Sequence, residues 1–457
     1  MRTDTGLASP HPATGSGGQR DHRLLLAVGI AVAAASAGLY AVALAAHPAI
    51  STLKGFDLHV YLMGGELARN KPAQLYAWQL QPGIQFTYTP FAALLFALIT
   101  SVPFRVLLDV LAAVSVASLT VTVWIAFREL GWRGTARTGA TLLVTGLALW
   151  TEPVQRTLFL GQIELVLMAL IVWDLCQPDR RWWKGAGTGI AAGIKLVPLI
   201  FIVYLLVTRR FRQAGVAVAA FAVTVLVGLA VLPHQSAQWW LHGYFLQASR
   251  TGFIGTMLNQ SQRGLLTRLI GSVAGAGPAW LAIAIVTGIV GLAAAALLDR
   301  AGHSFAGLMV CALTALLVSP ISWDHHWVWV APGLAVLVDA AFRAYGSGSR
   351  WACAAWAVTA AAVVVAFGAW PRWWPGGDTG LLQGGLIWYA PLSQFSSGDN
   401  PHYVEYHWHG LQDVAGNLYV IVGCALFVLA LAAGSYALQT WRSSQRQASG
   451  TPQRSRT

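Results

Sequence analysis

Residues 278–298 read PAWLAIAIVTGIVGLAAAALL, a run of 21 residues without a charged side chain. A membrane span needs about 20 apolar residues, because a helix must satisfy its own backbone hydrogen bonds across about 30 Å of hydrocarbon. Similar uncharged runs cover 24–46, 351–370 and 414–441. The repetition of such runs predicts a polytopic membrane protein rather than a soluble fold.

The composition supports this prediction. Of the 457 residues, 56% are hydrophobic and 10% are charged, whereas soluble domains are roughly a quarter charged. The net charge of +12 lies in short basic clusters between apolar runs, so it indicates membrane topology and no nucleic-acid partner. The four cysteines are isolated, without the spacing of a metal site.

The basic clusters predict the orientation of the chain. Short loops rich in Lys and Arg favour the cytoplasm, so we expect RELGWRGTAR (128–137), DRRWWK (179–184) and TRRFR (208–212) to be cytoplasmic. Both termini are then cytoplasmic, and 1–22 and 442–457 lack the apolar residues needed for a core. We predict that these two ends are disordered and that 23–441 form one membrane domain.

This orientation requires two apolar segments to begin and end on the same side. The segment 90–103 is short for a span, and 185–208 is interrupted by Lys195 and Pro198. We therefore predict an all-α bundle of ten full spans and two broken ones, with twelve plain spans as the alternative. Its long extracytoplasmic loops are 47–89, 233–277 and 371–413.

The first outer loop contains the strongest candidate for a general base. It includes KGFDLHVYLMGGELA (54–68), in which Asp57 is followed by His59 and Tyr61. A carboxylate among aromatic rings near the membrane surface can have a raised proton affinity. A solvated loop aspartate is the equally weighted alternative. Tyr88, in TYTPF (87–91), belongs to an aromatic group at the entry to the next segment.

Lys195 is the only charge in a segment of more than twenty residues. A charge at membrane depth is costly and normally faces a partner or a pathway, so we expect Lys195 to bind an anion. Snorkelling to the interface is the alternative. Glu164, near the start of its apolar run, is a weaker candidate, because a structural hydrogen bond explains it equally well.

Two further outer segments carry polar side chains. SPISWDHH (319–326) places His325 and His326 between tryptophans, where they suit hydrogen bonding to a phosphate better than metal binding, because neighbouring residues on a helix do not face each other. In MLNQSQRG (257–264), the amides of Asn259 and Gln260 could bind sugar hydroxyls or cap helices.

Taken together, these motifs resemble a known family. DLHVY, TYTPF, FLGQIELVLMAL, GIAAGIKLVP, NQS and SPISWDHHWVWV occur in the order typical of actinobacterial polyprenyl-phosphate-mannose-dependent α-1,2-mannosyltransferases, glycosyltransferase family 87, which have the GT-C fold. The resemblance covers about residues 24–335. It implies a plasma-membrane enzyme that moves mannose from polyprenyl-phosphate-mannose to a mannolipid, such as a phosphatidylinositol mannoside, lipomannan or lipoarabinomannan, on the outer face.

The resemblance also implies roles for the residues above. Asp57 would be the base of an inverting displacement, and Lys195, His325 and His326 would bind the donor phosphate. The weaker substrate-binding candidates are His59, Tyr61, Tyr88, Glu164, Asn259 and Gln260. Where some GT-C enzymes have paired acids in the first loop, this chain has Asp57-Leu58-His59 with one carboxylate, which argues against an obligatory metal, and no cofactor is expected. An arabinofuranose-dependent transferase and, in another class, a lipid-glycan flippase are the alternatives.

Overall fold

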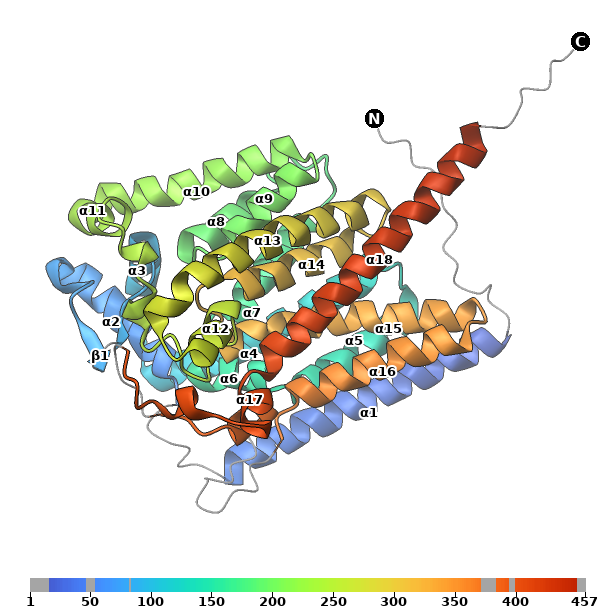
Figure 1. Ribbon diagram of the computed structural model, residues 1–457, viewed down its shortest axis with the longest axis horizontal. Helices are drawn as coiled ribbons and strands as arrows, with labels where there is room; N and C mark the ends of the chain where they lie inside the picture. Colours follow the sequence, from blue (N-terminus) through green and yellow to red (C-terminus); the bar gives the residue numbers. More distant parts are fainter. Residues whose placement is uncertain (1–15, 47–53, 82–83, 371–383, 394–398, 450–457) are drawn as a thin grey trace, which may run out of the picture. The chain divides into compact units, whose positions relative to one another are not determined.

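The computed structural model describes residues 16–46, 54–81, 84–370, 384–393 and 399–449 (Figure 1). The segments 1–15 and 450–457, which we predicted to be disordered, lie outside the described residues. Parts of the first and third outer loops lie outside them as well. The described chain is helical apart from one hairpin, β1 (Gln79–Gln81) with β2 (Ile84–Gln85). The predicted all-α membrane class is therefore confirmed.

Seven described helices are long and apolar enough to cross a membrane, or eight if one bent pair counts as a span. This number is lower than the ten full spans that we predicted, because several apolar segments form shorter helices. The predicted short segment is α3 (Pro90–Ala97), and the predicted interrupted segment is α8 (Ala186–Ile194) followed by α9 (Leu199–Val207). At 1.5 Å per residue, none of these three helices spans hydrocarbon alone.

The chain forms two compact units, and the single membrane domain over 23–441 stays a prediction. The first unit comprises Met1–His59, Val102–Cys176 and Asp324–Tyr389. Within it α1 packs on α5, α4 packs on α7, and α15 packs on α16. Its helices are α1 (Ser16–Ala46), α4 (Phe104–Glu129), α5 (Gly134–Ala148), α6 (Glu152–Leu160), α7 (Glu164–Leu175), η4 (Asp324–Trp329), α15 (Val330–Gly346), α16 (Arg350–Phe367) and η5 (Leu386–Tyr389).

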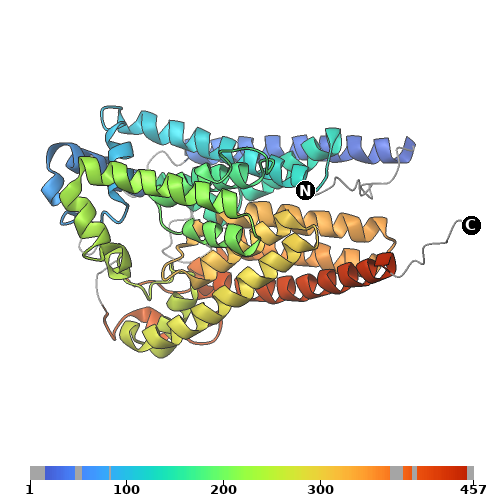
Figure 2. The ribbon, with the colours of Figure 1, turned by 90° about the horizontal axis from the view of Figure 1, so that it is seen from above.

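The second unit comprises Val60–Ser101, Gln177–Trp323 and Ala390–Thr457, and α2 (Phe56–Asn70) begins just before it. Here α8 packs on α10, and α13 packs on α14 and on α18, which is drawn in red beside the yellow α13 (Figure 2). Besides α3, α8 and α9 it contains η1 (Pro72–Gln74), α10 (Phe211–Val231), α11 (Pro233–Trp240), η2 (Tyr244–Leu246), η3 (Ala248–Thr251), α12 (Gln262–Ile270), α13 (Val273–Arg300), α14 (Ser304–Val318), η6 (Val404–His407), α17 (Leu411–Gly416) and α18 (Leu418–Ser449).

Two helices extend into the ends that we predicted to be disordered. Helix α1 begins at Ser16, inside the segment 1–22, and α18 continues to Ser449, inside the segment 442–457. Sequence composition underestimated these helices because it measures the apolar surface available for burial, whereas a long helix can continue beyond its apolar part.

Candidate functional site

Asp57 lies in the first turn of α2, in the first unit. The turn is fixed to the end of α6, because the backbone N–H of Gly55 donates to the carbonyl of Phe159 at 2.8 Å. Asp57 is half-buried and is engaged in further interactions. His59 is more exposed, and its Nδ1 lies 3.0 Å from the carbonyl oxygen of Gly55. The helix start therefore holds both residues in place.

Gly161 allows α6 to approach this turn. It ends α6 in the left-handed conformation, with φ of 66°, and a Cβ there would lie 2.9 Å from Cβ of Leu58. The chain then bends by 114° into α7. Because α6 also packs on η4, one short helix joins the Asp57 turn to the segment that carries both histidines. The motif FLGQIE therefore forms a second break, which we did not predict.

Helix α6 also contributes a buried cluster of charges. Arg156 Nε lies 3.2 Å from Oδ2 of Asp324 and 3.9 Å from Oε1 of Glu152, and all three side chains are almost completely buried. Trp388 Nε1 donates to Glu152 Oε1 at 3.0 Å, and its ring centroid is 5.0 Å from the guanidinium carbon of Arg156. Burial of charge is tolerated here because each charged group has partners.

Glu152 and Arg156 were not among the predicted site residues. The available signal was the one that identified Lys195, a charge within a mainly apolar segment, here LALWTEPVQRTLFLG (147–161). Asp324 was visible beside the histidines, but its pairing with Arg156 joins residues 168 positions apart in the chain. Sequence spacing could not indicate that pairing.

The structure brings His325, His326 and Glu164 together in the first unit. His325 Nδ1 lies 3.1 Å from Oδ1 of Asp324, and the backbone carbonyl of His325 accepts a bond from Thr157 Oγ1 at 3.3 Å. His326 Nε2 lies 3.5 Å from Glu164 Oε1. The two imidazole rings are perpendicular, with centroids 4.8 Å apart.

This arrangement orients His325 for a further partner. Its Nε2 is buried and has no hydrogen-bond partner among the described residues. Buried polar atoms are normally satisfied, so an unpaired one at a charged site suggests that a substrate group or water completes it. The carboxylate at Nδ1 fixes the orientation of the ring, so Nε2 is directed at that further partner.

Lys195 lies in the second unit, immediately after α8, with extended backbone angles φ −139° and ψ 133°. Its Nζ is 5.8 Å from the ring centroid of Tyr88. The hydroxyls of Tyr88 and Tyr61 are 3.0 Å apart, and Tyr61 stacks on Phe96 with centroids 4.5 Å apart. Three predicted site residues, Lys195, Tyr88 and Tyr61, therefore lie in one aromatic and cationic group.

A third tyrosine fixes the backbone of this group. Burial raises the pKa of Tyr76 well above its ordinary value, although the nearby Arg250 opposes the shift. The hydroxyl of Tyr76 therefore keeps its proton and donates to the backbone carbonyl of Tyr88 at 3.0 Å. Thr89 Oγ1 donates to the carbonyl of Gly193, so the entry to α3 is also fastened to α8.

Three glycines, four residues apart, set the position of α8 and hence of Lys195. A Cβ on Gly185 would lie 2.2 Å from the carbonyl oxygen of Gln213, and one on Gly189 would lie 2.2 Å from that of Ala217. A Cβ on Gly193 would overlap Thr224. Small residues at this spacing allow close helix packing in membranes. The approach of α8 to α10 therefore depends on these glycines.

Asn259 and Gln260 are fully buried and are used by the loop itself. The Asn259 amide donates to the carbonyls of Ile254 and Pro320, at 3.0 and 3.2 Å. Gln260 donates to those of Met257 and Gly416, each at 2.7 Å. Since both N–H donors of each amide are occupied, a structural role, which the sequence left open beside sugar binding, accounts for these residues.

The described side chains do not include a group of three or more His, Cys, Asp or Glu residues positioned to hold a metal ion. In the first unit the carboxylates of Glu152 and Asp324 face the guanidinium of Arg156 instead. The two carboxylates are therefore arranged around the guanidinium of Arg156, and this geometry suits hydrogen bonding and proton transfer.

Comparisons with known proteins identify related sequences. The model of glycosyltransferase family 87 matches residues 86–320. A polyprenol-phosphate-mannose-dependent α-(1-2)-phosphatidylinositol pentamannoside mannosyltransferase of Mycobacterium tuberculosis is 39% identical over 295 residues, which are 63% of this chain and 67% of that protein. The protein of the same name from Mycolicibacterium smegmatis is 36% identical, over 60% of this chain and 67% of its own length.

A third relative is named for a slightly different substrate. It is a phosphatidylinositol mannoside mannosyltransferase of Mycobacterium tuberculosis, also polyprenol-phosphate-mannose-dependent, and is 31% identical over 62% of this chain and 69% of that protein. No solved structure matches the chain.

Proposed function

The chain belongs to glycosyltransferase family 87, and we propose that it transfers mannose from polyprenyl-phosphate-mannose to a phosphatidylinositol mannoside, forming an α-1,2 linkage. The observation that carries this proposal is the similarity to relatives that are named for this donor, acceptor and linkage. The higher identity to the pentamannoside enzymes favours a phosphatidylinositol pentamannoside as the acceptor.

The proposed reaction is a single displacement at the anomeric carbon. The acceptor 2-hydroxyl loses its proton to Asp57, and its oxygen forms a bond to C1 of mannose. The bond between C1 and the phosphate oxygen breaks, and the polyprenyl phosphate leaves with the electron pair. Attack from the face opposite the leaving group converts a β-linked donor to an α-linked product, and it requires only one base.

The leaving phosphate gains negative charge during this step. Hydrogen-bond donors placed where charge develops lower the barrier. We assign this role to His325 and His326. The buried Nε2 of His325 supports the assignment, and Asp324 orients the ring through its contact with Nδ1. Arg156 holds Asp324 in position, since its guanidinium lies 3.2 Å from that carboxylate.

Lys195 is the second element of the proposal. A lysine held after the end of α8, beside the Tyr88 ring, presents a cation to a phosphate. Its role is argued from its own surroundings in the second unit and can be tested separately from that of the histidines.

The membrane arrangement proposed here places the reaction on the extracytoplasmic face. The basic clusters 128–137, 179–184 and 208–212 support this orientation through their excess of Arg and Lys. Asp57 follows the first spanning helix and therefore lies across the membrane from the N-terminus. Cysteine accessibility in intact cells would test the orientation.

The experiment that tests the function uses the purified full chain, radiolabelled polyprenyl-phosphate-mannose and a phosphatidylinositol mannoside acceptor. Asp57→Asn preserves size and removes the base, so kcat should fall by about 10²–10⁴, the usual contribution of a general base. Asp109→Asn is the matched control, since Asp109 is an exposed carboxylate on α4 of the same unit.

The control should retain full activity, and thermal unfolding of both variants should match the parent protein. Transfer that continues unchanged in Asp57→Asn would remove Asp57 from the mechanism. A parent protein that is folded but inactive with this donor and acceptor would contradict the proposed function itself.

A further inference from the structure

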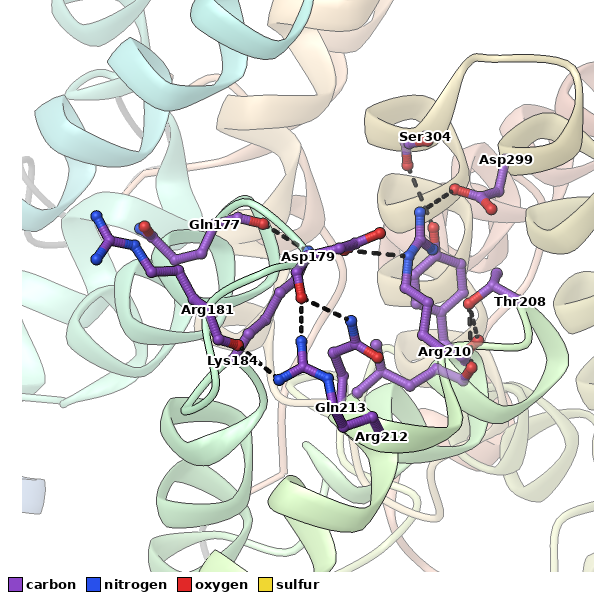
Figure 3. Close-up of polar contacts among 12 residues, drawn as sticks. Gln177, Asp179, Arg181, Lys184, Thr208, Arg210, Arg212, Gln213, Asp299 and Ser304 are labelled. Carbon is purple, nitrogen blue, oxygen red and sulfur yellow. Dashed lines mark hydrogen bonds and ion pairs between the residues drawn. The ribbon is translucent and has the colours of Figure 1, made fainter. Parts of the chain in front are cut away.

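Three segments of the second unit meet in a cluster of charged side chains (Figure 3). They are the loop 177–184 before α8, the turn 208–213 between α9 and α10, and the connection 299–304 between α13 and α14. The three segments contain seven Arg or Lys residues and two aspartates, for a net charge of +5. No step of the proposed reaction uses these residues.

The two aspartates are paired within the cluster. Arg210 Nη2 donates to Asp299 Oδ1 at 2.8 Å, and Lys184 Nζ donates to Asp179 Oδ1 at the same distance. Arg212 and Gln213 donate to the backbone carbonyl of Asp179, which fastens the loop to the first turn of α10 (Figure 3). Hydrogen bonds and ion pairs therefore hold the charged segments together.

Five arginines remain after this pairing, of which Arg212 donates to backbone carbonyls of the loop and Arg300 is the last residue of α13. Arg180, Arg181 and Arg209 are exposed, and their guanidinium groups have no side-chain partner within the part of the chain that the structure describes. We call these three arginines the basic patch. Arg212 donates to the backbone carbonyl of Arg181, so the two segments that carry these exposed cations are neighbours, and such a basic surface attracts anions.

The backbone of Arg209 supports a role for its side chain. Its φ of 62° is in the left-handed region, and it is the only non-glycine residue with a positive φ among the described residues. This conformation is costly for residues with a Cβ and is normally occupied by glycine. The arginine is therefore present despite a conformational cost, which points to a requirement for its charge.

The basic patch lies near the first turn of α10, and the exposed residues of this helix indicate what surrounds the patch. Val218, Val223 and Leu226 on this helix are 52%, 57% and 61% exposed, so the helix presents an apolar face to lipid. Its 21 residues extend about 31 Å, the thickness of the hydrocarbon core, so its ends lie near the headgroups. Phe211 and Trp182 beside the patch are exposed, as is common for aromatic residues at that depth.

We propose that the basic patch binds the phosphate-bearing headgroup of an anionic phospholipid. The proposal goes beyond mannose transfer, since it concerns a lipid that is neither donor nor acceptor. With the orientation proposed above, the lipid lies in the cytoplasmic leaflet, where anionic headgroups attract basic segments next to spanning helices. Apolar helix surface and exposed aromatic rings beside the arginines favour a lipid over a soluble anion.

The test measures lipid binding to the full chain in neutral detergent by native mass spectrometry. The probes are phosphatidylglycerol, phosphatidylcholine and soluble glycerol phosphate. We expect phosphatidylglycerol to bind at least about tenfold more tightly than phosphatidylcholine. One basic residue contributes about fivefold to such binding, so Arg209→Gly should lose about fivefold, and Arg180→Gln with Arg181→Gln about 25-fold.

Arg209→Gly is informative because it removes the charge and relieves the backbone strain together. Its thermal stability without added lipid should equal or exceed that of the parent protein. The matched control is Arg69→Gln, an exposed arginine of the same unit on α2, which should change binding by less than about twofold.

Three results would overturn the proposal. They are equal binding of the two lipids, patch variants that bind phosphatidylglycerol as the parent does, and glycerol phosphate binding as tightly as the lipid. Mannosyl transfer is measured separately in the parent protein. Failure of the lipid site therefore leaves the proposed function standing, and failure of transfer leaves the lipid site standing.

Discussion

Replacing Arg156 with methionine should destabilise the first unit strongly. The guanidinium is the cation for two almost completely buried carboxylates, at 3.2 Å from Asp324 and 3.9 Å from Glu152. Removing one partner of a buried ion pair leaves uncompensated charge and costs about 3–5 kcal/mol. Arg156→Lys should cost less, because it keeps the charge and loses only the planar contacts with Asp324 and Trp388.

A double-mutant cycle measures this interaction directly. Arg156→Met, Asp324→Asn and the double variant are compared by thermal unfolding in a mild detergent, monitored by tryptophan fluorescence. Residues in one network typically couple by about 0.5–3 kcal/mol, so the double variant should cost less than the two single changes combined. Arg128→Met is the matched control, since its pair with Glu129 is 42% and 32% exposed and should contribute at most about 1 kcal/mol.

The reasoning would be refuted by additive costs for the Arg156 and Asp324 variants, or by a cost of Arg156→Met no larger than that of Arg128→Met. Either result would mean that the buried carboxylates do not depend on the guanidinium. The role of Arg156 in holding Asp324 against His325 would then have to be abandoned.

Three other predictions follow from the structure. Lys195→Met should lower kcat/KM for the donor by about 10- to 150-fold, the equivalent of one charged hydrogen bond of ~1.5–3 kcal/mol, and Lys195→Arg should recover part of the lost kcat/KM. The measurement is steady-state kinetics with varied donor concentration, and an unchanged kcat/KM would mean that the lysine only snorkels. Transfer should be unchanged within twofold by EDTA, and a loss restored by Mg²⁺ or Mn²⁺ would show a metal requirement. Gly189→Val should destabilise the α8–α10 packing by about 1–3 kcal/mol in thermal unfolding, whereas Gly215→Ala, with open space around its Cβ position, should be neutral or slightly stabilising. Equal effects of the two changes would refute the close approach of α8 to α10.

The sequence predicted those features whose cause is local. A lysine and a proline interrupting an apolar run predicted the break between α8 and α9, and the structure has it at Lys195 and Pro198. The start of α3 also has a local cause, because Thr89 caps the helix by accepting from the backbone N–H of Ala92 at 3.1 Å. In each case the determining residues are neighbours in the chain.

Features that depend on distant partners could not be predicted in this way. The amides of Asn259 and Gln260 appeared free to bind sugar, but Gln260 is bonded to Gly416, 156 residues away. The bend after α6 depends on Gly161 in a left-handed conformation beside Leu58 of another helix. A charge in an apolar run identifies a residue that needs a partner, but only the fold identifies the partner.

In the proposed reaction the enzyme makes an α-1,2 mannosidic bond in one inverting step. The most direct measurement is ¹H NMR of the product formed by the purified chain from β-linked polyprenyl-phosphate-mannose, with the arabinofuranose donor assayed in parallel. We predict a single new mannose with the α anomeric signal, attached at the 2-hydroxyl, and no transfer of arabinose. A β-linked product, attachment at another hydroxyl, or transfer of arabinose in place of mannose would contradict the account.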